Sequence, residues 1–412
     1  MKKYLLILTT AAIVASCSSN DTFKKIEDSQ APIIFTSYAQ PATKAGTENN
    51  TGEYAWSLNN HHHSFDVWGF RTNNTNQNTW VFTKQLVEYN SSWSYTPARY
   101  WDKNADSYTF YAAAPNDTKW ALLDNSDSGN SDKNASYTDN TWYLTYTGYT
   151  LTDHDATTST INTNTNDNYA ESFSTAASGK DLMIADDCPW AKANFGNTVN
   201  LNFIHILSRL NVIIQRGEDL TNNDVLKLIE LKVSGFKSAG NFKENTRNAS
   251  NAAPGTETRW NTLSGSIDYT STYATSSSEL EVKYDADNNA SHVGHDVKQY
   301  VLQSLVIPQP ITFESIDTKG KKAGTDNPAE QAYLYIKYSI TNDSWSTTDK
   351  TETFEGYYNL AAAFNASSTN TTIAFNEGWQ NNLTIKVNPN TIDFTPMVSE
   401  WSNNVEYTYS IR

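Results

Sequence analysis

Short segments in which apolar and polar residues alternate recur along the chain, and this period of two limits the fold more than any other feature. Residues 199–203 (Val-Asn-Leu-Asn-Phe) and 383–387 (Leu-Thr-Ile-Lys-Val) both follow it. Successive side chains of a β-strand point to opposite faces, so the alternation predicts strands with one buried face. Helical spacing is scarce, and residues 220–230 are a weak candidate for a helical turn or two. Further strands are expected at 33–39, 65–70, 81–89, 93–95, 108–112, 204–210, 212–214, 229–233, 301–307 and 332–340.

The composition also favours an all-β protein. Thr, Asn, Ser and Tyr are abundant, and these residues form helices poorly. The 12 Trp, 24 Tyr and 16 Phe supply enough apolar surface for a folded core, which excludes an intrinsically disordered chain. A formal net charge of −15 would be repelled by phosphates, so no nucleic-acid partner is expected. A length of 412 residues suggests two or three domains.

The first twenty residues predict export. A short positive stretch, Met1-Lys2-Lys3, precedes an apolar segment at residues 4–14 that is too short to span a membrane. Small residues then stand directly before a cysteine in Val14-Ala15-Ser16-Cys17, which forms a bacterial lipobox. We therefore expect residues 1–16 to be a lipoprotein signal peptide and Cys17 to carry lipid. The alternative is an ordinary signal peptide with an incidental cysteine.

No group of residues in the sequence predicts catalysis or metal binding. Three consecutive histidines in a strand point to opposite faces, so residues 61–63 cannot converge on one metal ion. His205 lies in an apolar strand and is expected to be a hydrogen-bonded core histidine. Cys188 has no partner for a disulfide if Cys17 is lipidated, and is expected to be a small buried or loop residue. Ser264 sits in loop sequence without the context of a hydrolase. The carboxylate pairs, Asp186 with Asp187 and Glu352 with Glu355, are typical of any acidic chain of this length. We expect no catalytic residue, no metal, no cofactor and no enzymatic activity.

Two segments near the ends of the chain are candidate functional elements. Near the N-terminus a strand containing Ile33, Ile34, Phe35 and Tyr38 is followed by Pro and Gly residues that leave an exposed Lys44-Ala45 bond. Near the C-terminus the alternation is strict, and a terminal strand of this kind needs a sheet to bury it. Its apolar face is formed by Val405, Tyr407, Tyr409 and Ile411. The alternative is an ordinary last strand paired within its own domain.

The order and spacing of several motifs resemble the fimbrillin family, lipoproteins of the Bacteroidales that are the subunits of donor-strand pili. The motif that carries most of the resemblance lies in residues 199–214, as Phe203-x-His205-x-Leu207-Ser208-x-Leu210. The other motifs are Ile33-Ile34-Phe35 with Ala42-Thr43-Lys44-Ala45, FDVWGF at 65–70, WSYTPARYW at 93–101, YTFYAAAP at 108–115, DLMIA at 181–185, LVIPQ at 305–309, and Ile392-x-Phe394 with Trp401.

The resemblance implies two transthyretin-like antiparallel β-sandwich domains in series. We place them at residues 45–197 and 198–412, after a lipidated tether and first strand at 17–44. It further implies that a trypsin-like protease cuts after a basic residue, which maps onto Lys44 and Ala45; lysine for arginine there is a departure from the family. Removal of the first strand (Ile33, Ile34, Phe35 and Tyr38) then opens a groove for the strand of a neighbouring subunit.

The expected partners follow from the same resemblance. They are other pilus subunits, the trypsin-like processing protease, the outer-membrane lipid that Cys17 joins before processing, and host or microbial glycans or proteins. The donor strand is assigned to Val405, Tyr407, Tyr409 and Ile411, and the subunit is expected at the cell surface and then in an extracellular pilus that serves adhesion. Stalk, tip and anchor positions stay open. The alternative function is a surface lipoprotein that binds glycans through its many aromatic residues and does not polymerise.

Overall fold

The computed structural model of the chain describes most of its strands and the loops between them. No helix in the described ranges is long and apolar enough to cross a membrane. The residues described are 31–39, 63–73, 78–124, 142–151, 181–221, 223–244, 259–272, 280–282, 299–312, 315–326, 332–342, 350–364, 372–389 and 391–400.

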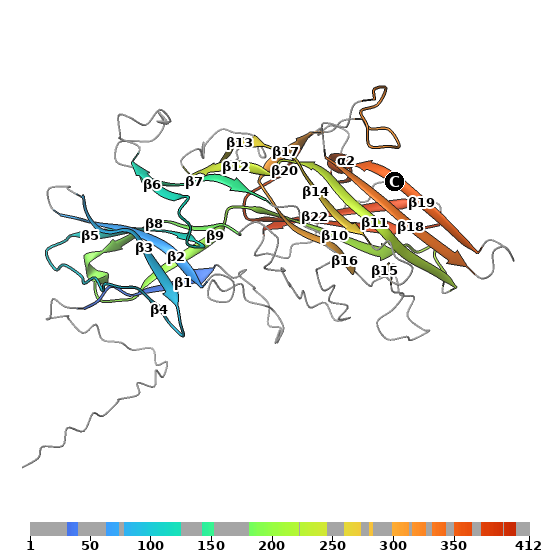
Figure 1. Cartoon of the computed structure of the whole chain (residues 1–412). Helices are drawn as coiled ribbons and strands as arrows, with labels where there is room; N and C mark the ends of the chain where they lie inside the picture. Colours follow the sequence, from blue (N-terminus) through green and yellow to red (C-terminus); the bar gives the residue numbers. More distant parts are fainter. Residues whose placement is uncertain are drawn as a thin grey trace, which may run out of the picture.

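The described chain is almost entirely β, and its sheets form two units that follow one another along a long axis (Figure 1). In these ranges the helical elements are the five-residue helix α2 (Leu360–Phe364) and the 3-10 turn η2 (Lys192–Asn194). Nearly all strand pairs are antiparallel; the parallel pairs among described strands are β1 with β9 and β10 with β21. The prediction of an all-β chain of antiparallel sandwiches in series is confirmed.

The N-terminal unit is built on a seven-stranded sheet. Its inner face encloses a core cluster that contains Phe65, Phe82, Phe110 and Phe203. Phe65 and Phe203 pack edge to face across the sheet, with ring centroids 5.3 Å apart. In sheet order the strands are β1 (Phe35–Ala39), β9 (Val199–His205), β8 (Met183–Ala191), β5 (Ser107–Ala114), β2 (Ser64–Thr72), β3 (Asn78–Tyr89) and β4 (Trp93–Ser94).

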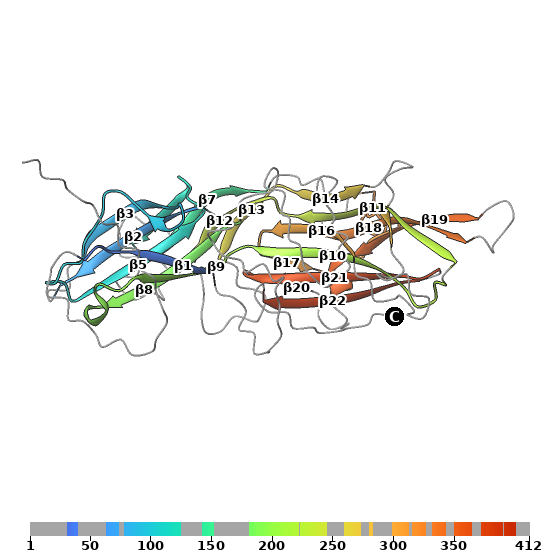
Figure 2. The same ribbon diagram turned by 90° about the horizontal axis from the view of Figure 1, so that it is seen from below.

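A smaller sheet joins the two units. It combines strands from either side of β9 in the sequence and belongs to the larger core cluster through Trp120, Tyr146, Phe242 and Trp260. Figure 2 shows it between the N-terminal sheet and the C-terminal strands. Its order is β13 (Trp260–Ser264), β12 (Ala239–Lys243), β7 (Trp142–Thr150) and β6 (Trp120–Asp124).

The C-terminal unit is a sandwich of two main sheets. One sheet has the order β16 (Gln299–Val306), β10 (Ser208–Arg216), β21 (Trp379–Val387) and β22 (Ile392–Glu400). The other has the order β14 (Ile267–Thr272), β11 (Asp224–Phe236), β18 (Tyr333–Asn342) and β19 (Thr351–Asn359), with β15 (Leu280–Glu281) also paired to β11. A separate pair consists of β17 (Gln309–Thr312) and β20 (Thr372–Phe375).

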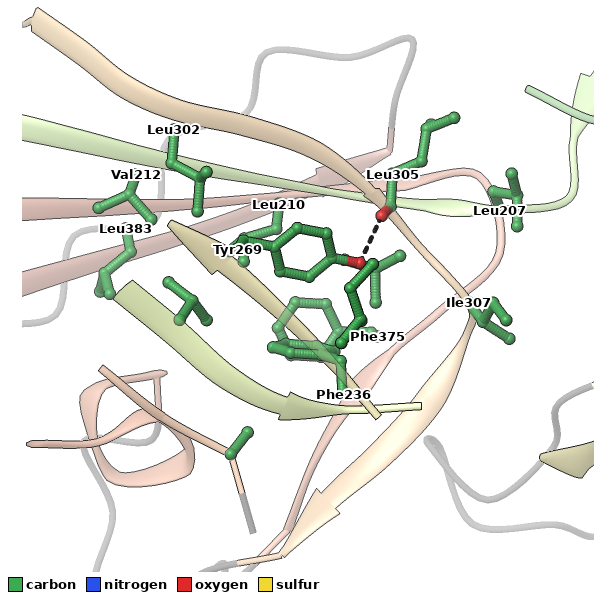
Figure 3. Packing of buried hydrophobic residues seen from close by; sticks show 14 of the residues in the cluster. Leu207, Leu210, Val212, Phe236, Tyr269, Leu302, Leu305, Ile307, Phe375 and Leu383 are labelled. Carbon is green, nitrogen blue, oxygen red and sulfur yellow. Dashed lines mark hydrogen bonds between the residues drawn. The ribbon is translucent and has the colours of Figure 1, made fainter. Parts of the chain in front are cut away.

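The core of the C-terminal sandwich forms where the apolar faces of the two sheets meet. Leu210, Val212 and Leu383 come from one sheet, and Phe236 and Tyr269 come from the other (Figure 3). The buried Tyr269 hydroxyl donates to the backbone carbonyl of Leu305 at 2.9 Å, so its polar atom is satisfied inside the core.

The division between the units differs from the expected one at residues 197 and 198. Strand β9, residues 199–205, pairs with β1 and β8, and its Val199, Leu201 and Phe203 lie in the N-terminal core. Alternation shows which face of a strand is buried but not which sheet the strand joins, and β9 is therefore misplaced by sequence pattern alone. The chain crosses to the second unit at residues 206–207.

The helical turn that residues 220–230 suggested is also wrong, because β11 runs from Asp224 to Phe236 as a strand. Its inward residues are Leu226, Leu228, Leu231 and Val233. The pairing with β18 shifts register between Leu228 and Glu230, so the inward positions there are three residues apart. This spacing resembles a helical period in the sequence.

A buried ion cluster fixes the small sheet to the C-terminal sandwich. Glu377, between β20 and β21, accepts hydrogen bonds from the backbone N–H of Arg259 (3.0 Å) and from its Nε (2.6 Å), and lies 2.6 Å from Nη2. The guanidinium also lies over the ring of Phe242, 5.0 Å from the centroid, and 3.9 Å from Glu244. Glu244 in turn accepts the N–H of Leu144 in β7. The cluster therefore ties strands of the small sheet to the C-terminal unit.

Candidate functional site

Strand β1 lies at the edge of the N-terminal sheet and is the element on which the candidate site is built. Residues 35–39 pair in parallel with residues 199–203 of β9. The segment just before β1 pairs with a different part of the chain: the N–H of Ile33 donates to the carbonyl of Arg99 (2.8 Å), and the N–H of Trp101 donates to that of Ala31 (3.1 Å). The first described segment, residues 31–39, therefore bridges two backbone edges that its removal would leave unpaired.

The inward side chains of this segment fill the N-terminal core. Ile33 and Phe35 are 1% and 3% exposed. The Phe35 ring packs against Phe82, Tyr95 and Phe110, with centroid distances of 5.4, 5.7 and 5.5 Å. These neighbours come from β3, from the loop after β4 and from β5. The single side chain of Phe35 therefore packs against three separate parts of the N-terminal unit.

A half-buried phenol, that of Tyr95, helps to hold the segment in place. The Tyr95 hydroxyl donates to the carbonyl of Ile33 at 2.7 Å and accepts the N–H of Arg99 at 3.3 Å. Burial raises the pKa of Tyr95 above its ordinary value, although the hydrogen bond and charge of Arg99 act in the opposite direction. The phenol therefore remains a neutral donor over the physiological pH range. Sequence reasoning placed 93–101 among the strands of this domain but missed its role as the second edge.

The third inward position of the segment is filled less well than the first two. Ser37 follows Phe35 on the same face and lies opposite Leu201, which is fully buried. Its Oγ is buried and has no hydrogen-bond partner among the residues that the structure describes. A buried hydroxyl without a partner is destabilising, so Ser37 makes the packing of β1 in the sheet less stable than an apolar residue would.

Replacing this hydroxyl by a methyl group is expected to stabilise the uncut protein. Ser37→Val removes the unsatisfied oxygen and adds a β-branched side chain, and we expect a gain of about 1 kcal/mol in the free energy of unfolding. Urea unfolding of the full chain measures it. The matched control is Thr36→Val on the exposed face of the same strand, which should change stability little. A loss of stability in Ser37→Val would mean that no room exists at this position.

The structure separates the residues that the sequence assigned to the first strand. Ile33 and Phe35 point into the core, whereas Ile34 is 47% exposed and faces away from it. The backbone of Tyr38 pairs with Asn202. The lipidation residue Cys17, the processing residues Lys44 and Ala45, and the donor residues Val405, Tyr407, Tyr409 and Ile411 lie outside the described residues.

The residues that the sequence analysis considered for catalysis or metal binding lie in the following surroundings. His205 is the last residue of β9, and its Nδ1 lies 2.9 Å from Oδ2 of Asp181, with both side chains largely buried. Glu355 accepts a hydrogen bond from the Tyr335 hydroxyl, and Cys188 is half-buried. Within the described ranges, no three His, Cys, Asp or Glu residues are grouped so that they could hold a metal ion.

Comparisons with known proteins return similar structures only. No protein-family model matches the chain, and no curated protein matches it. A fimbrial protein from Bacteroides vulgatus is similar with 16% identity and a TM-score of 0.48, over 90% of this chain and 99% of that one. The tip fimbrial protein Mfa3 from Porphyromonas gingivalis, with a C-terminal truncation, is similar with 10% identity and a TM-score of 0.32, over 83% and 95%. Both of these similar structures are fimbrial proteins.

Proposed function

We propose that the chain is a structural subunit of a cell-surface pilus, exported as a lipoprotein through Cys17 and assembled by exchange of its first strand. The observation that carries the proposal is the position of residues 31–39. They form an edge segment that fills the core with Ile33 and Phe35, and Lys44-Ala45 follows the end of β1 by five residues. Cleavage there by a trypsin-like protease would cut the segment from the rest of the chain.

Loss of this segment would leave unpaired backbone and exposed apolar surface in the N-terminal unit. Two backbone edges, at β9 and at residues 99–101, lose their partners, and the apolar surface around Phe82 and Phe110 is uncovered. A sheet edge beside an open apolar groove accepts an extended strand readily. In the proposed function the strand is the C-terminal segment of a neighbouring subunit, with Val405, Tyr407, Tyr409 and Ile411 as the side chains that enter. The role is structural and adhesive, without catalysis.

The test uses the exported chain made soluble by Cys17→Ser. Limited treatment with a trypsin-like protease is expected to cut at Lys44-Ala45, identified by mass spectrometry, and to yield a ladder of oligomers that survives mild denaturant. Deletion of residues 403–412 should abolish the ladder but not the cut, and Lys44→Gln should prevent both. A cut protein that keeps its tail and stays monomeric would contradict the proposal.

A second candidate function is binding of glycans without polymerisation. The observation that favours it is Trp80, which is 40% exposed and packs edge to face against Trp142, with centroids 4.7 Å apart. Four of the other eight described tryptophans are buried core residues: Trp68, Trp101, Trp120 and Trp260. Sugar binding by a monomeric cut protein on a glycan array, lost in Trp80→Ala, would favour this candidate over the pilus subunit.

A further inference from the structure

The connection between β17 and β18 gathers three lysines within four residues. Residues 315–326, named the lysine loop from here on, contain Lys319, Lys321 and Lys322 around Gly320. The first of these lysines is exposed and the other two are half-buried. A trypsin-like protease cuts after lysine or arginine, so the loop presents three bonds of the kind that the proposed processing requires.

A cut in the lysine loop would divide the C-terminal sandwich. Each of its two main sheets combines strands from both sides of the loop: β10, β11, β14 and β16 precede it, and β18, β19, β21 and β22 follow it. After such a cut, the later strands and the tail beyond β22 would be joined to the rest of the subunit by noncovalent contacts alone. Because the tail links one subunit to the next in the proposed pilus, the loop has to stay intact while the first segment is removed.

The carboxylate of Asp317 closes the loop from inside. Its Oδ1 accepts the backbone N–H groups of Lys321 and Lys319, both at 2.8 Å. These two hydrogen bonds favour the ionised carboxylate and lower the pKa of Asp317 below its ordinary value, so it remains an acceptor at neutral pH. The backbone adds two connections: the N–H of Asp317 donates to the carbonyl of Lys321 (2.8 Å), and the N–H of Gly320 donates to the carbonyl of Asp317 (3.1 Å).

The base of the loop is paired as well. Ile316 and Lys322 form an antiparallel bridge, and the N–H of Ala323 donates to the carbonyl of Ser315 at 3.0 Å. The carbonyl of Lys322 accepts both the N–H (3.0 Å) and the hydroxyl (3.2 Å) of Thr325. The backbone on both sides of the lysines is therefore engaged within the loop itself.

Gly320 fixes the tip of the loop to the sheet beneath it. It is buried and has a φ of +72°, a conformation that favours glycine. A Cβ at this position would lie 2.8 Å from Cδ1 of Tyr357 and 3.2 Å from Cε2 of Tyr333, so the backbone of Gly320 rests directly on two tyrosine rings. These rings contact each other, with centroids 5.8 Å apart, and belong to the paired strands β19 and β18.

This conformation differs from the one that a protease binds. An active site that takes a peptide as an extended strand pairs with its backbone N–H and C=O groups. In the lysine loop the chain turns back on itself, and these groups are hydrogen-bonded to one another. Cleavage therefore needs local opening, and its rate follows the population of the open form.

We propose that the lysine loop is a protection against the processing protease that is built into the fold. Asp317 and Gly320 hold the three lysines in a conformation that a trypsin-like protease does not bind, so the C-terminal sandwich stays uncut while the first segment is removed. The inference rests on the proposed function for the presence of the protease, whereas the resistance of the loop is a property of the chain that trypsin alone can measure.

The test is limited digestion of the full chain with Cys17→Ser by trypsin in native buffer, with the cut sites identified by mass spectrometry. We expect the loop to stay intact under conditions that cut a free peptide of residues 315–326 completely. Asp317→Ala removes both side-chain hydrogen bonds, and Gly320→Ala adds a Cβ for which the tyrosine rings leave no room. Each should accelerate cleavage in the loop at least about tenfold, whereas the matched control Thr318→Ala, at an exposed position, should stay within about twofold of the parent.

Three outcomes would overturn the inference. The first is cleavage of the loop in the natural chain at the rate of the free peptide, and the second is cleavage of the Asp317 and Gly320 variants no faster than the Thr318 control. The third is equal acceleration at sites outside the loop, which would show general loss of stability, and thermal unfolding of each variant checks for it. A resistant loop in a chain that is not cut at Lys44 would contradict the proposed processing and leave this inference intact.

Discussion

Phe35→Ala is expected to reduce the free energy of unfolding of the uncut protein by about 3–5 kcal/mol, the usual cost of truncating a buried phenylalanine. The ring is 3% exposed and contacts Phe82, Tyr95 and Phe110, which come from three parts of the N-terminal sheet. These neighbours are held by their own strands, so they cannot collapse fully into the cavity. Urea unfolding followed by tryptophan fluorescence of the full chain measures the loss.

The control for this prediction lies on the next residue. Ile34 is 47% exposed, and Ile34→Ala should change stability by no more than about 0.5 kcal/mol. Once the chain is cut after Lys44, the same loss of free energy weakens the binding of the cut segment that contains β1. Since 1.4 kcal/mol is a factor of ten, Phe35→Ala should shift release of the cut segment by roughly a hundredfold or more. Equal effects of Phe35→Ala and Ile34→Ala would contradict the burial of Phe35 as the main force holding β1.

The sequence predicted the elements of this site better than their assembly. The strand expected at residues 33–39 is present as β1 at residues 35–39, because Ile33-Ile34-Phe35 and a following Pro and Gly-rich stretch define it locally. Its partners were not predictable, since Arg99 lies 66 positions and Val199 164 positions beyond Ile33 and Phe35. Pairing over such distances depends on the whole sheet, and alternation alone carries no information about it.

The same limit explains the two corrections to the fold. β9 has the pattern of a strand that either unit could accept, and only the packing of Val199, Leu201 and Phe203 in the N-terminal core assigns it. The register shift in β11 lies inside one strand and alters the spacing that sequence reasoning depends on. The small sheet was not foreseen at all, because it joins residues 120–150 to residues 239–264.

That small sheet has a mechanical consequence in the proposed pilus. Tension would enter a subunit at the groove of β1, in the N-terminal unit, and leave through the tail that follows β22, in the C-terminal unit. It would therefore have to cross the junction between them. The ion cluster of Arg259, Glu377 and Glu244 lies at this junction and holds the small sheet to the turn before β21. We expect this cluster to contribute strongly to the free energy of unfolding, and substitution of Glu377 to measure that contribution.

Glu377→Ala should reduce the free energy of unfolding by about 3–5 kcal/mol, because it leaves the guanidinium of Arg259 buried without its nearest carboxylate. The side chains are 5% and 13% exposed, so solvent screens the pair little. Arg259 would keep only Glu244, at 3.9 Å, as a described acidic neighbour. The matched control is Lys337→Met, which breaks a pair with Glu355 whose side chains are 37% and 62% exposed, and should change stability by less than about 1 kcal/mol. Thermal unfolding of both variants measures the loss of stability, and small-angle X-ray scattering detects bending between the units. A Glu377→Ala chain that is as stable and as straight as the parent would contradict the prediction. The apolar contacts of Phe242 and Trp260 would then hold the junction without the ion pair.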